Sequence, residues 1–204
     1  MARYTGPRMR IARREGVLLP GITMIKRDYP PGQHGPKGRP RKVSQYGQQL
    51  REKQKAKRMF GLLERQFSNI VAKAMRRQGD SAEGLLELLE RRLDNVVYRL
   101  GWTTTRQGAR QLITHGDVLV NDKRLNIPSS IVSIGQTISL AKAVGNRPTW
   151  AVRSEALATY QTPRWLQATD NGKATVAGKV TALPVTQDGE AVLNTQAIIE
   201  FYSK

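Results

Sequence analysis

Three stretches between residues 63 and 115 carry apolar residues at helical spacing. Residues 63–75 and 85–100 repeat leucine, isoleucine, valine and phenylalanine three or four positions apart, which predicts helices with one buried face. The second stretch is long enough for two consecutive helices. A shorter helix is predicted over residues 106–115, with Thr104 or Thr105 as its N-cap. Packing in a core is enough to explain the apolar face of residues 63–75.

After residue 116 the pattern changes to alternation, which predicts strands. Residues 118–125 alternate around an Asn-Asp pair that tolerates the left-handed backbone of a two-residue turn, so a hairpin is predicted there. Residues 130–140 predict a further strand, and residues 150–160 a helix. Glycine and proline then punctuate loops, and residues 197–204 are predicted as a short strand or an extended anchor.

These patterns predict an α+β fold in three parts. Residues 1–43 lack a sustained period and are expected to form an extended basic arm. Residues 44–91 are expected to form a helical domain that the C-terminal segment 160–204 completes. Residues 92–159 are expected to form an inserted module of two short helices and a small antiparallel sheet, with the helix that follows. On composition alone, a solvated disordered tail explains the arm equally well.

Charge narrows the choice of partner. The chain has 34 Lys and Arg against 16 Asp and Glu, a net charge of +18, and residues 1–60 alone hold sixteen of these cations against three acids. Such an excess favours a polyanion, with nucleic acid ahead of an anionic membrane surface. The basic helix predicted over residues 45–60 lacks the wide apolar face that membrane insertion requires. No apolar run of membrane-spanning length or signal-peptide core is present, so a soluble, unexported protein is expected.

The sequence offers little for catalysis or metal binding. Cysteine is absent, and His34 and His115 are too few for a histidine metal cluster. No phosphate-binding loop of the Gly-x4-Gly-Lys-Ser/Thr type occurs, and paired carboxylates lie on the polar faces of predicted helices. We therefore expect no enzyme activity, no cofactor and no small-molecule substrate.

The start of the third helix is better suited to binding. Thr105, Arg106 and Arg110 place a hydroxyl and two cations beside exposed backbone amides, an arrangement that could face one phosphate backbone. A solvated helical face with an ordinary threonine cap is the alternative.

Several motifs resemble one family. The segments ERRLDNVVYRLG, ARQLITHGDVLVN and IPS resemble a small helix-helix-hairpin RNA-binding module. That module is shared by the family of small-subunit ribosomal protein four, some pseudouridine synthases and tyrosyl-tRNA synthetases. The segments YPPGQHG, LREKQK, GLLERQF and IIEFYS resemble the ribosomal family alone, so the resemblance covers nearly the whole chain. A pseudouridine synthase would need a large catalytic domain, and about ninety residues after the module are too few for one.

The resemblance implies a structural constituent of the small ribosomal subunit. It implies a primary binder that contacts 16S rRNA directly and nucleates assembly of the subunit body. The implied partners are 16S rRNA, ribosomal protein uS5, other small-subunit proteins, and mRNA near the channel through which it enters. With uS5 such a protein contributes to translational accuracy, and in some bacteria it represses its own message. The implied location is the ribosome, in a bacterial cytoplasm or a plastid stroma, without a membrane partner.

Charge and resemblance together imply RNA-binding residues in all three parts of the chain. In the arm they are Arg3, Tyr4, Arg8, Arg10, Arg13, Arg14, Lys26, Arg27, Tyr29, Pro30, Gly32, Gln33, His34, Gly35, Lys37, Arg39, Arg41 and Lys42. In the basic helix they are Ser44, Tyr46, Arg51, Lys53, Gln54, Lys55, Lys57 and Arg58. In the module they are Thr105, Arg106, Arg110, Gln111, His115, Gly116, Lys123 and Arg124.

One departure from the family pattern concerns metal. Many members carry an N-terminal four-cysteine zinc knuckle that begins just before RREG, but Met9 and Ala12 stand at the matching positions here. The chain therefore resembles the zinc-free branch, in which RNA and packing must order the arm.

We expect the purified protein to contain no stoichiometric zinc, because the thiolate ligands are absent and two histidines cannot replace them. Elemental analysis measures this directly. Stoichiometric zinc whose removal by a chelator unfolds the protein would contradict the prediction.

Overall fold

The computed structural model of the chain describes most of its residues and divides it into two compact units. The described residues are 4–22, 24–25, 27, 29–36, 42–157, 160–170, 176–185 and 193–203. The first unit comprises residues 1–85 and 190–204, and the second comprises residues 86–189. The boundary falls within the helix α4 (Ser81–Glu90).

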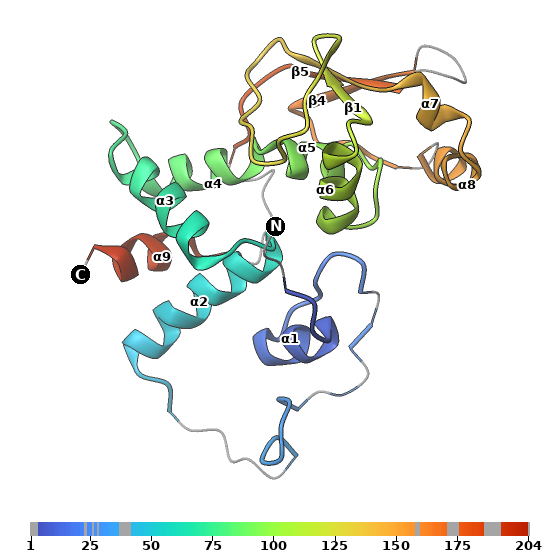
Figure 1. Cartoon of the computed structure of the whole chain (residues 1–204). Coiled ribbons are helices and arrows are strands. Elements are labelled where there is room, and N and C mark those ends of the chain that lie inside the picture. The colour runs from blue at the N-terminus through green and yellow to red at the C-terminus, as the bar shows by residue number, and fades with distance from the viewer. Residues whose placement is uncertain are drawn as a thin grey trace. The chain divides into compact units, whose positions relative to one another are not determined.

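The first unit is helical (Figure 1). Besides the start of α4, its helices are α1 (Arg8–Glu15), α2 (Gln45–Met59), α3 (Glu64–Met75) and α9 (Thr195–Tyr202). Ser44 caps α2, because its side chain accepts a hydrogen bond from the backbone N–H of Gly47. The predicted helix over residues 63–75 is confirmed by α3.

The C-terminal segment differs from its prediction as a strand or extended anchor. It forms α9, which Asn194 caps by accepting a hydrogen bond from the backbone N–H of Ala197. Its aromatic residues pack against other helices of the unit: the ring centroids of Phe201 and Tyr46 lie 5.4 Å apart, and those of Tyr202 and Phe67 lie 6.3 Å apart. These contacts join α9 to α2 and α3 and favour the helix over an extended chain.

The arm also contains more structure than its sequence predicts. Residues 8–15 form α1, where an irregular segment was expected. Ala12 and Leu19 are buried together with Met59 of α2, so the arm contributes to a small apolar cluster of the first unit. The side chain of Glu15 is also buried and forms an ion pair with Arg58. Apolar contact and charge pairing therefore hold α1 on α2.

The second unit combines helices with a five-stranded antiparallel sheet (Figure 1). The strand order is β2-β1-β3-β5-β4. The strands are β1 (Val118–Val120), β2 (Lys123–Arg124), β3 (Thr137–Leu140), β4 (Leu166–Asp170) and β5 (Val176–Val180). The helices are the end of α4, then α5 (Leu93–Arg99), α6 (Arg106–Thr114), α7 (Lys142–Gly145) and α8 (Pro148–Leu157). This architecture confirms the α+β class.

Local predictions for the second unit are confirmed. The stretch 85–100 divides into the end of α4 and α5, and Thr105 caps α6 by accepting a hydrogen bond from the backbone N–H of Gly108. Asn121 and Asp122 form the hairpin turn with φ of 48° and 62°, and Val120 pairs with Lys123.

The prediction of loops after residue 160 is wrong for β4 and β5. These strands pair with each other, and β5 pairs with β3, where Gly178 lies opposite Ile138. A Cβ at Gly178 would lie 2.5 Å from Leu100 Cδ2, so glycine lets the strand approach α5 closely. Residues 160–189 therefore belong to the unit that contains the sheet, whereas the sequence assigned 160–204 to the helical domain.

One large core supports the second unit. Trp165, Trp102, Leu93, Ile113 and Ile138 are among its buried side chains, which come from both helices and strands. The helices and sheet therefore fold around a shared apolar interior. In the described part of the chain, no helix has both the length and the apolar character needed to cross a membrane.

Glu64 links three helices of the first unit. Its carboxylate accepts hydrogen bonds from Lys53 Nζ and Lys57 Nζ of α2 and from Tyr202 Oη of α9, each 2.8 Å long. Burial raises the pKa of this carboxyl, but the hydrogen bonds from Lys53, Lys57 and Tyr202 outweigh burial and lower the pKa to about 2. Because this pKa lies below the ordinary value of 4.5, its stabilising contribution is complete above that pH and is lost as the pH falls toward 2.

We expect Glu64→Gln to lower the free energy of unfolding by about 1 kcal/mol near neutral pH, a modest value because half of the side chain is exposed. The difference from wild type should shrink at about pH 3, because the carboxyl of the unfolded chain is then protonated and folding must release that proton. Denaturant titrations near neutral pH and at about pH 3 measure this difference in the free energy of unfolding. Glu83→Gln, which neutralises an exposed carboxylate of α4, is the control and should change little. A loss of equal size at both pH values would contradict the role of the charge.

Candidate nucleic-acid interface

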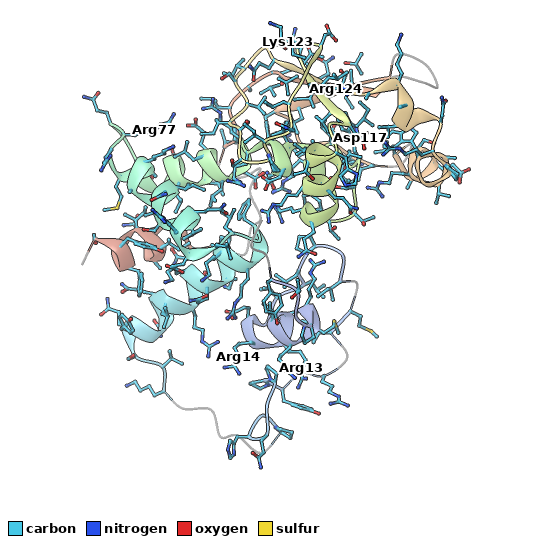
Figure 2. All side chains as sticks on the ribbon, in the orientation of Figure 1. Arg13, Arg14, Arg77, Asp117, Lys123 and Arg124 are labelled. Atoms are coloured by element: carbon cyan, nitrogen blue, oxygen red, sulfur yellow. The ribbon has the colours of Figure 1, made fainter. Side chains whose placement is uncertain are left out.

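Arginines of α1 hold the Gly/Pro-rich loop of residues 29–36. Arg13 donates hydrogen bonds to the carbonyl of Tyr29 at 2.9 and 3.1 Å and to that of Pro30 at 3.3 Å, and its guanidinium lies 4.7 Å from the centroid of the Tyr29 ring. Arg14 donates to the carbonyl of Pro31 at 3.5 Å. Figure 2 shows both arginines on α1. They therefore position the loop through its carbonyl groups.

The loop itself is compact and has an exposed tip. The backbone N–H of Gly35 donates to the carbonyl of Gly32, and a Cβ at Gly35 would lie 1.9 Å from the carbonyl oxygen of Pro30. Only glycine fits this turn, so the motif YPPGQHG specifies its shape. Gln33 and His34 are exposed at the tip, where they are accessible to a ligand.

Each cation of α2 forms an ion pair with an acid of the same unit. Lys53 is 7% exposed, donates to Glu64, and has its Nζ 4.9 Å from the centroid of the Phe201 ring. Lys55 pairs with Glu52 at 2.6 Å. Lys53 thus lies inside the unit, unlike the surface contact that the sequence predicted. Its cationic side chain holds α9 in place.

Other predicted residues of the first unit are accessible. Gln54 is half-buried, while Ser44, Tyr46 and Arg51 are exposed on or beside α2. The predicted contacts Tyr4, Arg10, Arg27, Pro30, Gly32 and Lys42 are also exposed, and Arg8 is half-buried. Arg3, Lys26, Lys37, Arg39 and Arg41 lie outside the described residues.

A buried network ties α6 to the preceding helices in the second unit. Asn95, which has no exposed surface, donates from Nδ2 to Glu90 Oε2 at 2.7 Å and accepts at Oδ1 from Arg106 Nε at 2.8 Å. Arg99 holds the same Glu90 carboxylate through two hydrogen bonds of 2.9 and 2.7 Å. The guanidinium of Arg106 also lies 4.6 Å from the centroid of the Tyr98 ring. Hydrogen bonds and stacking together fix α6 against α5.

Asp94 makes a second connection between the same helices. Its buried carboxylate accepts two hydrogen bonds from Arg92 at 3.1 and 2.9 Å, and one from Arg110 Nε at 2.6 Å. Arg106 is 4% exposed and Arg110 is half-buried. The structure therefore differs from the expectation that both arginines face one phosphate backbone, because α5 offers partners that the sequence pattern of α6 does not show.

The exposed face of α6 carries polar side chains. Gln107, Gln111 and His115 recur four residues apart and are all exposed. Gln107 was not predicted, although its spacing from Gln111 and His115 is visible in the sequence. Lys123 and Arg124 are exposed on β2, next to the hairpin turn (Figure 2). This surface offers hydrogen-bond donors on the helix and charge on the hairpin, and Gly116 ends the helix beside His115.

Metal binding has no support in the described part of the chain. No group of three or more His, Asp or Glu side chains lies close enough there to hold an ion.

The buried network leads to a stability prediction. We expect Arg106→Ala to lower the free energy of unfolding by about 2 kcal/mol, because it leaves the buried Oδ1 of Asn95 without the hydrogen bond that Arg106 donates. Gln107→Ala, one residue along the same helix but exposed, should change it by less than about 0.5 kcal/mol. Thermal and denaturant unfolding compare the two. Equal stability of both variants would contradict the network.

The sequence matches two family descriptions in succession. Residues 3–90 match the family described as "Ribosomal protein S4/S9 N-terminal domain", and residues 91–138 match "S4 domain". Among similar proteins is "Small ribosomal subunit protein uS4" of Roseiflexus castenholzii, which is 50% identical over 212 residues. Proteins of the same name from Chloroflexus aurantiacus and Akkermansia muciniphila are 48% and 44% identical. Each comparison covers the whole of both chains. The chain therefore belongs to the small ribosomal subunit protein uS4 family, whose members are structural ribosomal proteins and not enzymes.

Proposed function

We propose that the protein binds 16S rRNA directly, as a primary binder that nucleates assembly of the body of the small subunit. The observation that carries this proposal is the set of exposed cationic and polar side chains that remains after the buried pairing is complete. These side chains lie in the arm and beside α2 in the first unit, and on α6 and β2 in the second. Family membership supports rRNA as their partner.

The proposed contacts have two physical roles. Exposed cations such as Arg10, Arg124 and Lys123 neutralise phosphates and release counterions, which supplies affinity that depends on salt. Gln107, Gln111 and His115 can donate and accept hydrogen bonds, which suits riboses and base edges on the wide minor groove of RNA. The paired residues Lys53 and Arg106 act indirectly in this proposal, by holding the helices that present the exposed groups.

The finer parts of the function rest on the family alone. We include ribosomal protein uS5 and mRNA near the channel through which it enters as partners, and a contribution with uS5 to translational accuracy. The functional division into an arm (1–43), a helical domain that α9 completes, and an RNA-binding module that includes the sheet is likewise a proposal. In this proposal, the residues that contact RNA are the exposed ones among those predicted from the sequence.

A binding experiment tests the central proposal. Filter binding of the full chain to a 16S rRNA fragment containing a multi-helix junction should give much higher affinity than binding to an unrelated RNA of equal length. The comparison is made above about 0.15 M salt, where non-specific electrostatic binding is weak. Equal affinity for both RNAs would refute a primary and specific role.

The arm provides a quantitative prediction. Each phosphate that a cation neutralises in single-stranded RNA adds about 0.7 to the slope of log affinity against log salt, rising to about 0.9 in a duplex. Replacement of Lys37, Arg39, Arg41 and Lys42 by Gln should therefore reduce the slope by about 2 to 3 if most of them contact phosphates. Affinity measured at several salt concentrations gives the slope. An unchanged slope would show that this part of the arm is a passive tail.

A further inference from the structure

The outward face of α3 carries a stripe of polar and cationic residues that the sequence analysis treated as part of a packing helix. Arg65, Asn69, Lys73 and Arg76 are all exposed, with Arg76 at the C-cap. At about 100° per residue, these four positions lie within about 80° of one another around the helix axis. They oppose Phe67, Val71 and Ala74, the buried face of α3. The helix therefore has a core face and a distinct basic face.

No described residue neutralises this basic stripe. In the described part of the chain, the side chains of Arg65, Lys73 and Arg76 form no hydrogen bond or ion pair. The cations of α2 behave differently, since Lys53 and Lys57 pair with Glu64 and Lys55 pairs with Glu52. The two helices belong to the same unit. The three charges of α3 are thus available to an external anion.

Helix stability explains only part of the stripe. Lys73 lies in the last turn and Arg76 caps it, where cations interact favourably with the negative end of the helix dipole. Arg65 lies in the first turn, where a positive charge is unfavourable. The N-cap of the helix, Leu63, makes no side-chain hydrogen bond, so Arg65 is not part of a capping interaction. Its presence on the same face as Lys73 and Arg76 requires a different reason.

We infer that this stripe, Arg65, Asn69, Lys73 and Arg76, binds the sugar-phosphate backbone of rRNA. The inference rests on the proposed function and adds to it a surface outside the predicted residue set. At a rise of about 1.5 Å per residue the stripe is about 16 Å long, which allows contact with more than one phosphate. Arginine and lysine pair with phosphate, and the amide of Asn69 can donate to a phosphate or ribose oxygen.

The composition of the stripe favours RNA over a protein partner. Protein interfaces centre on large apolar or aromatic anchors, and the stripe itself contains none. Ala72 is exposed beside the stripe, and its small side chain leaves room for the sugar-phosphate backbone of RNA. Contacts of this kind carry no sequence information, so the stripe contributes affinity and orientation to binding.

A charge-neutral variant tests the inference. Arg65→Gln, Lys73→Gln and Arg76→Gln are combined in the full chain, and affinity for the junction-containing 16S rRNA fragment is measured at several salt concentrations. The slope of log affinity against log salt should fall by about 2 to 3, because three phosphate contacts are lost. The melting temperature should stay close to that of wild type, since all three side chains are exposed.

A matched variant controls for net charge. Lys142→Gln, Arg164→Gln and Lys179→Gln remove three exposed cations of the second unit and should change the slope by less than about 1. An unchanged slope in the α3 variant, or an equal fall in both variants, overturns the assignment of the stripe while the proposed function stands. A wild-type chain that does not bind the fragment overturns the proposed function and the stripe together.

A second measurement does not depend on a variant. Acylation of lysine amines, followed by mass spectrometry, compares the free chain with its complex with the rRNA fragment. Lys73 should react in the free chain and be protected in the complex, whereas Lys142 should react in both. Lys73 that stays reactive in the complex overturns the assignment.

Discussion

Pairing between arginine and buried carboxylate is the interaction on which this structure depends. A chain with 34 cations and 16 acids repels itself, and a carboxylate that leaves water needs a partner of opposite charge. Glu90 and Asp94 meet both requirements in the second unit, because each is fully buried and each is held by arginines. Glu15 does the same in the first unit, where it pairs with Arg58. A few buried carboxylates therefore hold several of the arginines in place.

This pairing separates the cations into two groups with different roles. Arg106 and Lys53 are buried and connect helices to one another, and the buried Arg92 holds Asp94 at the start of α5. Arg10 and Arg124 are exposed on α1 and β2, where they can meet phosphates. The exposed cations therefore lie on helices and strands that the buried pairs have already fixed. Preorganised charge of this kind lowers the entropy lost on binding.

Features determined by nearby residues were predictable from the sequence. Ser44 and Thr105 cap helices through a backbone N–H three residues ahead, and Asn121 and Asp122 form their turn locally. The motif YPPGQHG resembles the family pattern, and the turn at Gly35 explains why it needs a glycine there. The family could also be inferred, because its motifs recur in order along the whole chain.

Features determined by distant residues were not predictable in the same way. Helix α9 depends on aromatic contacts with α2 and α3, and β5 depends on pairing with β3 and on the space that Gly178 leaves for Leu100. The site shows the same limit: Lys53 and Arg106 look like surface cations until Glu64 and Asn95 are brought beside them. The basic stripe of α3 was overlooked because the apolar face of that helix gives the stronger pattern.

The division of cations into two groups is tested most directly by arginine modification. A dicarbonyl reagent is applied to the free chain and to its complex with the junction-containing 16S rRNA fragment, and mass spectrometry measures the reaction of each arginine. Arg92 and Arg106 should be unreactive in both states, whereas Arg10 and Arg124 should react in the free chain and be protected in the complex. An Arg106 that reacts as fast as Arg124 in the free chain, and that RNA then protects, would contradict the account.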